Sequence, residues 1–296
     1  MEIKSIKDFV EQFLVRPGKE ISLKKDFDSG FKGDFFDKQS ASEVLEQGVA
    51  ALSDLQGRLY AEGRRSVLII LQAMDAAGKD STIKHVMSGL NPQGCQVTSF
   101  KSPTAEELAH GFLWRCAKAV PPKGFIGIFN RSYYEEVLVT KVHPEILAAQ
   151  KLPTSDFGKS FWNQRYNQIN GFEDYLTSTG TTIIKFFLNV SHEEQKERFE
   201  ERLKEPEKNW KFSPSDMTER QFWPLYQSAY EDMLNKTSTK NAPWYVIPAD
   251  RKWFTRLAVA GTILYHLQLM NPKYPEISGS QKAKLAECAQ ILADEK

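Results

Sequence analysis

The sequence predicts an α/β fold, a three-layer sandwich in which a five-stranded parallel sheet lies between two layers of helices. Three observations support this prediction. Strand-like and helix-like patterns alternate along the chain. The strand-like runs are almost continuously apolar, as expected for strands that are buried on both faces. Turn-forming residues, such as those at 91–94, separate the elements, and no internal repeat is present.

The expected strands are short apolar runs, and the expected helices follow the 3.6-residue period. The strands are expected at 66–71, 96–100, 125–129, 182–190 and 244–247. Helices are expected at 41–62, from 83 onward, at 105–119, after a capping box formed by Ser191 and Glu194, and at 257–270. We expect three parts: an N-terminal arm (1–40), the main domain (41–270) with a lid around 195–215, and a C-terminal helical tail (271–296).

Composition narrows the function classes. The chain has 296 residues, 41% hydrophobic and 26% charged, with a formal net charge of +1. A nucleic-acid-binding protein usually has a strong basic excess, so no nucleic-acid partner is expected. No apolar run is long enough to span a bilayer, and no membrane partner is expected. Three scattered cysteines and no metal-spaced histidine pair indicate reduced thiols, a cytoplasmic location and no zinc site.

The most informative segment is 73–82 (AMDAAGKDST), a loop of small residues between the first strand and a helix. Backbone N–H groups, the helix N-terminus and Lys79 would converge there on a phosphate. The segment departs from the usual pattern, because Ala73 replaces the first glycine and Asp80 follows the lysine, with Ser81 one place later. Asp75 would repel phosphate unless a divalent cation lay between them, which suggests Mg²⁺. The alternative is a strand-to-helix turn whose small residues serve packing.

The residues after the third strand form the second candidate cluster. Ligands of open parallel sheets bind beyond the carboxyl ends of the strands. There, Arg131 could bind phosphate oxygens with two donors, and Glu135 could hold Mg²⁺ through water. Asn130 stands where many related sites have aspartate. The alternative is that these residues only cap the start of a helix. This alternative is stronger for Glu136 than for Arg131.

Two further clusters have plausible structural alternatives. The cations Arg198, Arg202, Lys208 and Lys211 could form a flap that closes over phosphates, but many glutamates accompany them, so a solvated helix is the alternative. Arg115 could hold the phosphate of an acceptor nucleotide while an aromatic residue backs its base. Its neighbours Phe112 and Trp114 would more often belong to the core.

Taken together, AMDAAGKDST, GIFNRSYYEEVLV, EPEKNWKFS and TSTKNAPWYVIPADRKWF resemble the family 2 polyphosphate kinases, from about Ile21 to about Leu267. The segments Asn130-Arg131-Ser132 and 207–211 are most similar to the class III members. The resemblance implies a P-loop kinase-like fold with a helical lid. It implies transfer of the terminal phosphoryl group of inorganic polyphosphate to AMP and ADP, giving ADP and ATP. Mg²⁺ would be the cofactor, with Mn²⁺ as an alternative.

The resemblance also implies roles for individual residues. Asp75 and Glu135 would serve the metal, Lys79 would hold the transferred group, and Arg131 would stabilise transition-state charge. The phosphate and nucleotide contacts would include Ala76, Ala77, Gly78, Asp80, Ser81, Arg115 and Asn130. The polyphosphate lid and channel would include Arg198, Arg202, Lys208, Lys211, Lys24 and Lys25.

The family precedent further points to a homodimer or homotetramer. Guanine nucleotides are a further option as acceptors, because the sequence leaves the preferred base open. Two rival functions stay open at this stage. One is an ordinary nucleoside monophosphate kinase that uses ATP as donor, and Asp75 and Asp80 in the loop argue against it. The other is a nucleotide-binding switch without catalysis, which would bind nucleotides but never turn them over.

Overall fold

A six-stranded sheet forms the centre of the computed structural model, which describes residues 3–33 and 38–295. Its strands lie in the order β1-β6-β5-β2-β4-β3. β1 is antiparallel to β6, and all other neighbours are parallel. The strands are β1 (Leu14–Val15), β2 (Ser66–Ala73), β3 (Cys95–Ser99), β4 (Ile126–Asn130), β5 (Thr181–Asn189) and β6 (Trp244–Pro248).

The five expected parallel strands are confirmed, but the expected number of strands in the sheet was too low by one. The additional strand, β1, comes from the N-terminal segment and pairs through only two residues, Leu14 with Tyr245 and Val15 with Trp244. A strand of two residues has no readable periodicity. The same segment places Ile6, Val10 and Phe13 in the hydrophobic core, so it is packed into the domain.

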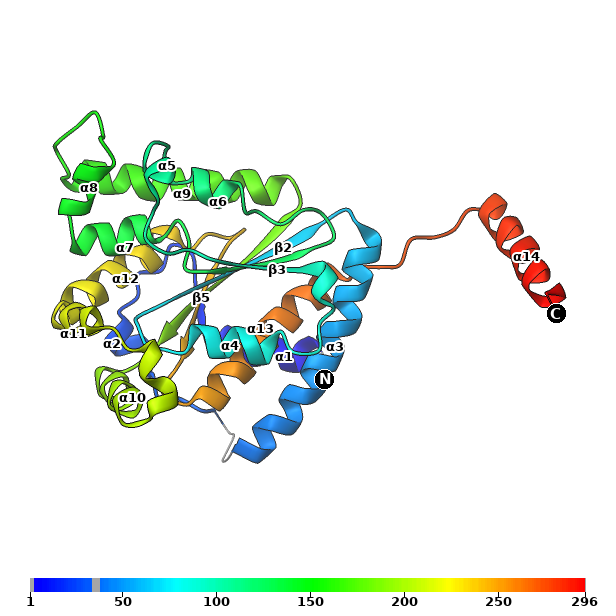
Figure 1. The fold of residues 1–296 in the computed structure, drawn as a ribbon, viewed down its shortest axis with the longest axis horizontal. Helices are drawn as coiled ribbons and strands as arrows, with labels where there is room; N and C mark the ends of the chain where they lie inside the picture. Colours follow the sequence, from blue (N-terminus) through cyan, green and yellow to red (C-terminus); the bar gives the residue numbers. More distant parts are fainter. Residues whose placement is uncertain (1–2, 34–37, 296) are drawn as a thin grey trace.

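Helices cover both faces of this sheet (Figure 1). One face carries α1 (Ile3–Glu11), α3 (Lys38–Glu62), α4 (Lys79–Val86) and α13 (Lys252–Met270). The other carries α7 (Glu135–Val142), α9 (Lys159–Ser178) and α12 (Trp223–Thr237). At the carboxyl ends of the strands lie α10 (His192–Lys204), the 3-10 segment η2 (Pro206–Lys211) and α11 (Pro214–Gln221). The remaining short elements are α2 (Leu23–Asp26), η1 (Pro92–Gly94), α5 (Ala105–Leu108), α6 (Trp114–Ala117) and α8 (Glu145–Ala149).

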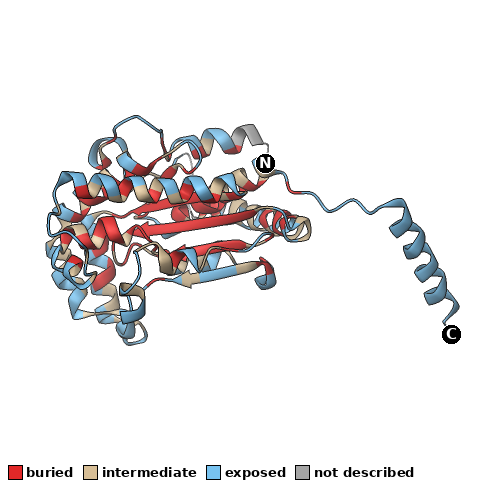
Figure 2. Ribbon diagram, turned by 90° about the horizontal axis from the view of Figure 1, so that it is seen from above, coloured by how far each residue is buried: buried red, intermediate tan, exposed pale blue. Residues whose placement is uncertain are grey.

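The central strands are buried on both faces, as their continuous apolar sequence predicts (Figure 2). Every residue of β2 and β6 is buried. The edge strand β3 has no buried residue. Because the strands run parallel, the loops that follow β2, β4 and β6 meet at one edge of the sheet, next to α10.

Two helix expectations need correction. The single helix expected at 105–119 is two short helices, α5 and α6, because α5 ends at Leu108 and Gly111 lies in the turn before α6. Only half of the expected capping box is present: Ser191 accepts from the Glu194 N–H (3.0 Å), but the Glu194 carboxylate pairs with Arg198 instead.

The last helix, α14 (Gly279–Asp294), stands apart from the rest of the molecule at the end of an extended segment (Figure 1). All its residues are exposed. Across residues 3–33 and 38–295, no helix combines the length and the apolar character that a bilayer crossing requires.

Candidate active site

The loop between β2 and α4 has the backbone of an anion-binding turn. Gly78 adopts φ +105° and Ala76 φ +60°, two left-handed conformations within three residues. Lys79 opens α4, is buried, and donates to the backbone carbonyls of Ala73 (2.9 Å) and Met74 (3.3 Å). Its ammonium group therefore lies folded over the loop. Burial and the neighbouring Arg131 charge lower the pKa of Lys79, while Asp75 and Glu135 act in the opposite direction.

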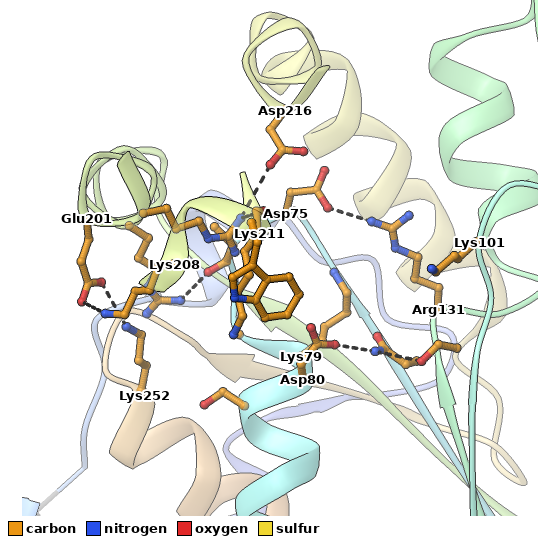
Figure 3. Close-up of a pocket in the computed structure, with 18 of the residues that line it drawn as sticks. Asp75, Lys79, Asp80, Lys101, Arg131, Glu201, Lys208, Lys211, Asp216 and Lys252 are labelled. Carbon is orange, nitrogen blue, oxygen red and sulfur yellow. Dashed lines mark hydrogen bonds and ion pairs between the residues drawn. The ribbon is translucent and has the colours of Figure 1, made fainter. Parts of the chain in front are cut away.

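Asp75 and Arg131 form an ion pair across the two loops that follow β2 and β4. Arg131 Nη2 donates to Asp75 Oδ1 at 2.8 Å (Figure 3). Arg131 itself has φ +64°, an uncommon conformation for a side chain of this size. Burial alone would lower the pKa of Arg131, but the carboxylates of Glu135 and Asp75 raise it, so the guanidinium stays charged.

Glu135 begins α7 and lies in the same cluster. The Gln72 side chain is oriented with its amide nitrogen toward Glu135. In this orientation the nitrogen donates to Glu135 Oε1 (2.8 Å), and the amide oxygen accepts from the Ser132 N–H (3.1 Å). Burial raises the pKa of Glu135, and the charges of Arg131 and Lys79 offset part of this rise. Two carboxylates, Asp75 and Glu135, thus lie close enough to Lys79 and Arg131 that their charges act to raise the pKa of both.

Asn130 and Ser81 also lie in the site but have protein partners. Asn130 Nδ2 donates to Asp80 Oδ1 (2.6 Å), and Arg256 Nη2 donates to Ser81 Oγ (2.9 Å). These bonds tie the start of α4 to β4 on one side and to α13 on the other. The structure thus brings together the two loop clusters that the sequence pointed to.

A cavity of about 680 Å³ opens in front of the loop. Its charged lining consists of nine cationic residues and four acidic ones, a formal balance of nine minus four, or +5, against +1 for the whole chain. The cations are Lys79, Lys101, Arg131, Arg198, Arg202, Lys208, Lys211, Lys252 and Arg256. Such local concentration of charge is what a nearly neutral protein needs to bind a polyanion.

The wall made by α10, η2 and α11 carries the four expected lid cations, and Arg198, Arg202 and Lys208 are in ion pairs. Lys208 pairs with Glu201 (2.6 Å) and Glu205 (2.7 Å). Arg202 faces Asp216 of α11 at 3.6 Å. Lys211 lies over the ring of Trp210, whose side chain is largely exposed. The side chains of Asp75, Lys208, Lys211 and Asp216 surround the same space (Figure 3).

The surroundings of Arg198 do not fit the expectation that this residue belongs to a mobile flap. Its side chain is buried and donates to the carbonyls of Ala76 (2.9 Å), Ala77 (2.9 Å) and Ala249 (2.6 Å). It also pairs with Glu194 at 2.7 Å. Because three of these partners are backbone groups of the phosphate loop and of the segment after β6, Arg198 braces the loop while it also lines the cavity.

Arg115 lines a second cavity of about 320 Å³, which shares Phe100, Lys101 and Arg131 with the first. One Arg115 nitrogen donates to the Lys101 carbonyl (2.7 Å), and the guanidinium lies over the Phe100 ring. Phe112 also lines this cavity. Trp114 does not line it; the Trp114 ring stacks on His110 with centroids 4.0 Å apart.

Lys24 and Lys25 are exposed on α2 and line neither cavity. Sequence reasoning missed Lys101, Lys252 and Arg256, which do line the larger one. A usable signal existed for Lys252: it closely follows β6, and the rule that ligands bind beyond the carboxyl ends of parallel strands applies to that strand as well.

Comparison with known proteins agrees with this geometry. The model of the Polyphosphate kinase 2 (PPK2) family matches residues 36–275. The ADP-polyphosphate phosphotransferase of Rhodopseudomonas palustris is 48% identical over 283 residues, which cover 95% of this chain and 98% of that protein. The AMP/ADP-polyphosphate phosphotransferase of Meiothermus ruber is 44% identical over 270 residues, covering 90% and 96% of the two chains.

A solved structure extends the similarity to three dimensions. The crystal structure of polyphosphate kinase 2 from Arthrobacter aurescens TC1 superposes with a TM-score of 0.83 at 40% identity, covering 92% of this chain and 95% of that one. The sheet, the phosphate loop and the basic cavity thus occur in a chain that matches both the family model and a solved member over most of its length. The chain belongs to the polyphosphate kinase 2 family.

Proposed function

We propose that this chain is a polyphosphate-dependent nucleotide kinase, which transfers the terminal phosphoryl group of inorganic polyphosphate to AMP and to ADP. The observation that carries the proposal is the pair of cavities that meet at Arg131. The larger is lined by a cationic excess, and the smaller has a more apolar lining that includes Phe100 and Phe112. A linear polyanion fits the first, and a nucleotide with an aromatic base fits the second. Curated relatives named for polyphosphate, AMP and ADP support the same reading.

Phosphoryl transfer requires positioning and charge more than a covalent nucleophile. Lys79 lies at the phosphate loop, where it would leave the Ala73 and Met74 carbonyls to contact the transferred group. Arg131 lines both cavities, so it can reach oxygens of the donor and of the acceptor. A bidentate guanidinium there would stabilise the negative charge that spreads over the transferred group in the transition state.

The donor set around Asp75 and Glu135 fits a divalent cation. Mg²⁺ prefers oxygen ligands and is usually held by one or two carboxylates together with substrate phosphates. Asp75 and Glu135 follow neighbouring strands, and both influence Lys79. Within residues 3–33 and 38–295, no three or more His, Cys, Asp or Glu side chains are grouped so that they could hold a metal ion. When bound, the cation would neutralise charge on the phosphates. We propose Mg²⁺, with Mn²⁺ as a substitute.

The decisive experiment supplies AMP, polyphosphate and Mg²⁺ without ATP and follows ADP and then ATP by ³¹P NMR. The proposal expects both products in sequence, and none after addition of EDTA. A matched control is Lys79→Met, which should lose turnover while keeping the native circular-dichroism spectrum. Product that forms only when ATP is the donor would show an ordinary nucleoside monophosphate kinase instead. Binding of nucleotide with no turnover from either donor would show a non-catalytic switch.

Other expectations remain predictions that the same preparation can check. GMP and GDP are proposed as further acceptors, to be compared with AMP and ADP in time courses. A homodimer or homotetramer is proposed, to be tested by light scattering. The functional core is proposed to be residues 41–270, and the location cytoplasmic.

A further inference from the structure

A buried ion pair is bonded to the turn between Arg131 and Glu135 and has no place in the proposed chemistry. Lys185 of β5 has an exposed fraction of 0%, and Glu173 of α9 one of 1%. Lys185 Nζ and Glu173 Oε2 are 2.6 Å apart. Lys185 is the one charged residue of β5. The other residues of this strand are two threonines, five apolar residues and a final asparagine.

The polar atoms of this pair are all used. Glu173 Oε1 accepts from both the Tyr133 hydroxyl (2.8 Å) and the Tyr134 hydroxyl (2.7 Å). Lys185 donates three hydrogen bonds: to Glu173, to the Tyr134 oxygen (2.8 Å) and to the Thr237 carbonyl (2.7 Å). Burial and the Glu173 charge raise the pKa of both tyrosines, so their hydroxyls stay protonated and donate.

Stability alone does not account for such a cluster. Replacing a buried ion pair by apolar residues of similar volume is often neutral or stabilising. What distinguishes this pair is its attachment. Tyr133 and Tyr134 lie between Arg131 and Glu135 in the chain, so the two hydroxyls that meet on one carboxylate oxygen belong to the turn that presents both proposed active-site residues.

The same turn is fixed from its other side as well. The Arg131 N–H donates to the Leu71 carbonyl (3.0 Å), and Ser132 Oγ accepts from the Tyr134 N–H (3.2 Å). Arg131 has φ +64°. A residue with a large side chain persists in this conformation only where its surroundings hold it there. The buried tyrosines provide that hold, because they pin the segment immediately after it.

We propose that the Lys185–Glu173 pair, acting through the Tyr133 and Tyr134 hydroxyls, is a positioning element that aims Arg131 and Glu135 into the active site. This inference rests on the proposed function. Tyr134, Glu173 and Lys185 line neither cavity, and Tyr133 borders the smaller one. The hydroxyls and the ion pair act on Arg131 and Glu135 through the turn. A displacement of about 1 Å in catalytic groups can cost about 10²-fold in rate, so small losses of order behind the site have a measurable effect.

The test compares Tyr133→Phe and Tyr134→Phe with a matched control, Tyr245→Phe. Tyr245 is equally buried, its hydroxyl makes one hydrogen bond to His266 (2.8 Å), and it lines neither cavity. Each of the three variants removes one buried hydroxyl. We expect kcat to fall roughly 10- to 100-fold in the first two and to stay native in the control. Tyr134 lines neither cavity, so Tyr134→Phe should also keep KM for AMP within about twofold.

A second readout needs no turnover. Mn²⁺ binding followed by electron paramagnetic resonance should weaken several-fold in Tyr133→Phe and Tyr134→Phe, because Glu135 is misaligned, and should be unchanged in Tyr245→Phe. A purely structural role would lower the melting temperatures of all three variants alike and leave both kcat and Mn²⁺ affinity native. That result would overturn the inference.

A variant carrying Tyr133→Phe, Tyr134→Phe, Glu173→Leu and Lys185→Met guards against misfolding, because it leaves no buried charge unpaired. We expect it to melt near the native temperature and still lose at least 10-fold in kcat. Native kcat in this folded variant would also refute the proposal. Failure of the proposed function is distinguishable, because the unmodified protein itself would then form no ADP from AMP and polyphosphate.

Discussion

Arg198→Met provides the sharpest test of how the phosphate loop is held. The substitution keeps a long apolar stem but removes the guanidinium that donates to the carbonyls of Ala76, Ala77 and Ala249. It also leaves Glu194 without its 2.7 Å partner. The loop carbonyls then face a buried space with no donor, and the brace between the loop and the segment after β6 is lost.

The expected magnitude follows from these contacts. Leaving a buried polar group without its partner costs about 1–3 kcal/mol, and three backbone carbonyls lose a donor here. Glu194 is 26% exposed and can be hydrated, so we expect a total loss of about 3–5 kcal/mol from the carbonyls. At about 2 °C per kcal/mol for a large domain, this is a fall of roughly 6–10 °C in melting temperature. Because the loop itself moves, kcat should fall by about 10²-fold and not only the affinity for polyphosphate.

The matched control is Arg202→Met, one turn further along α10. Arg202 is partly exposed, with a 3.6 Å ion pair to Asp216 and a 3.3 Å bond to the Lys211 carbonyl. This pair is partly exposed and long at 3.6 Å, and ion pairs that water can reach contribute at most about 1 kcal/mol. This variant should therefore keep its melting temperature and raise KM for polyphosphate.

The assay is differential scanning fluorimetry together with initial rates at varied polyphosphate and fixed AMP. If Arg198→Met proves too unstable to purify, Arg198→Lys retains the charge with fewer donors and should show an intermediate loss. The reasoning would be refuted if Arg198→Met melted with the native protein and only KM for polyphosphate rose, since that is the behaviour of a lid residue.

Three further predictions follow from single features. Asp75→Asn and Lys79→Met should each reduce turnover by about 10²–10³-fold with little change in melting temperature, checked by initial rates and circular dichroism. Burial lowers the pKa of His266 from 6.5 to about 4. Below pH 6.5 the unfolded chain therefore binds a proton at His266 that the folded chain does not. The free energy of unfolding should fall by up to about 3 kcal/mol as the pH is lowered from 6.5 to 4. Urea titrations of His266→Gln should lack this part of the pH dependence. Deleting residues 277–296 should leave melting temperature and kcat within error of native, because every residue of α14 is exposed; a fall of several degrees would show a contact made by this helix.

The sequence was sufficient to predict the parallel sheet and the loops at the carboxyl ends of its strands. Strands such as β2 and β5 are buried over almost their whole length, so their apolar runs are long and unambiguous. The association of Asp75, Lys79, Arg131 and Glu135 followed from strand parallelism alone, since neighbouring parallel strands end at the same edge. Their roles remain predictions for kinetics to test.

What the sequence could not predict depends on tertiary contacts. Arg198 lies among charged neighbours in the sequence, and no periodicity distinguishes a residue whose donors reach the loop after β2 from one that faces solvent. β1 exists only because β6 offers a free edge to two residues. Arg256 lies inside α13, about one turn after the segment that follows β6, where α10 and the phosphate loop make contact. Only folding brings its guanidinium within hydrogen-bonding distance of Ser81.

Two kinds of cation lie on and next to helix α10, and their different surroundings suit different tasks. At the middle of α10, Arg198 is buried and bonded to backbone groups, and such bonds are too costly to exchange during a reaction cycle. Beyond its second half, Lys208 pairs with Glu201 and Glu205, and Lys252 lies 3.6 Å from the same Glu201. These pairs are half-exposed and individually weak, so phosphate oxygens can replace the carboxylates at little cost. A polymeric donor of variable length needs both properties: a loop fixed in place where the bond breaks, and cations along the chain that are free to change partners as it advances.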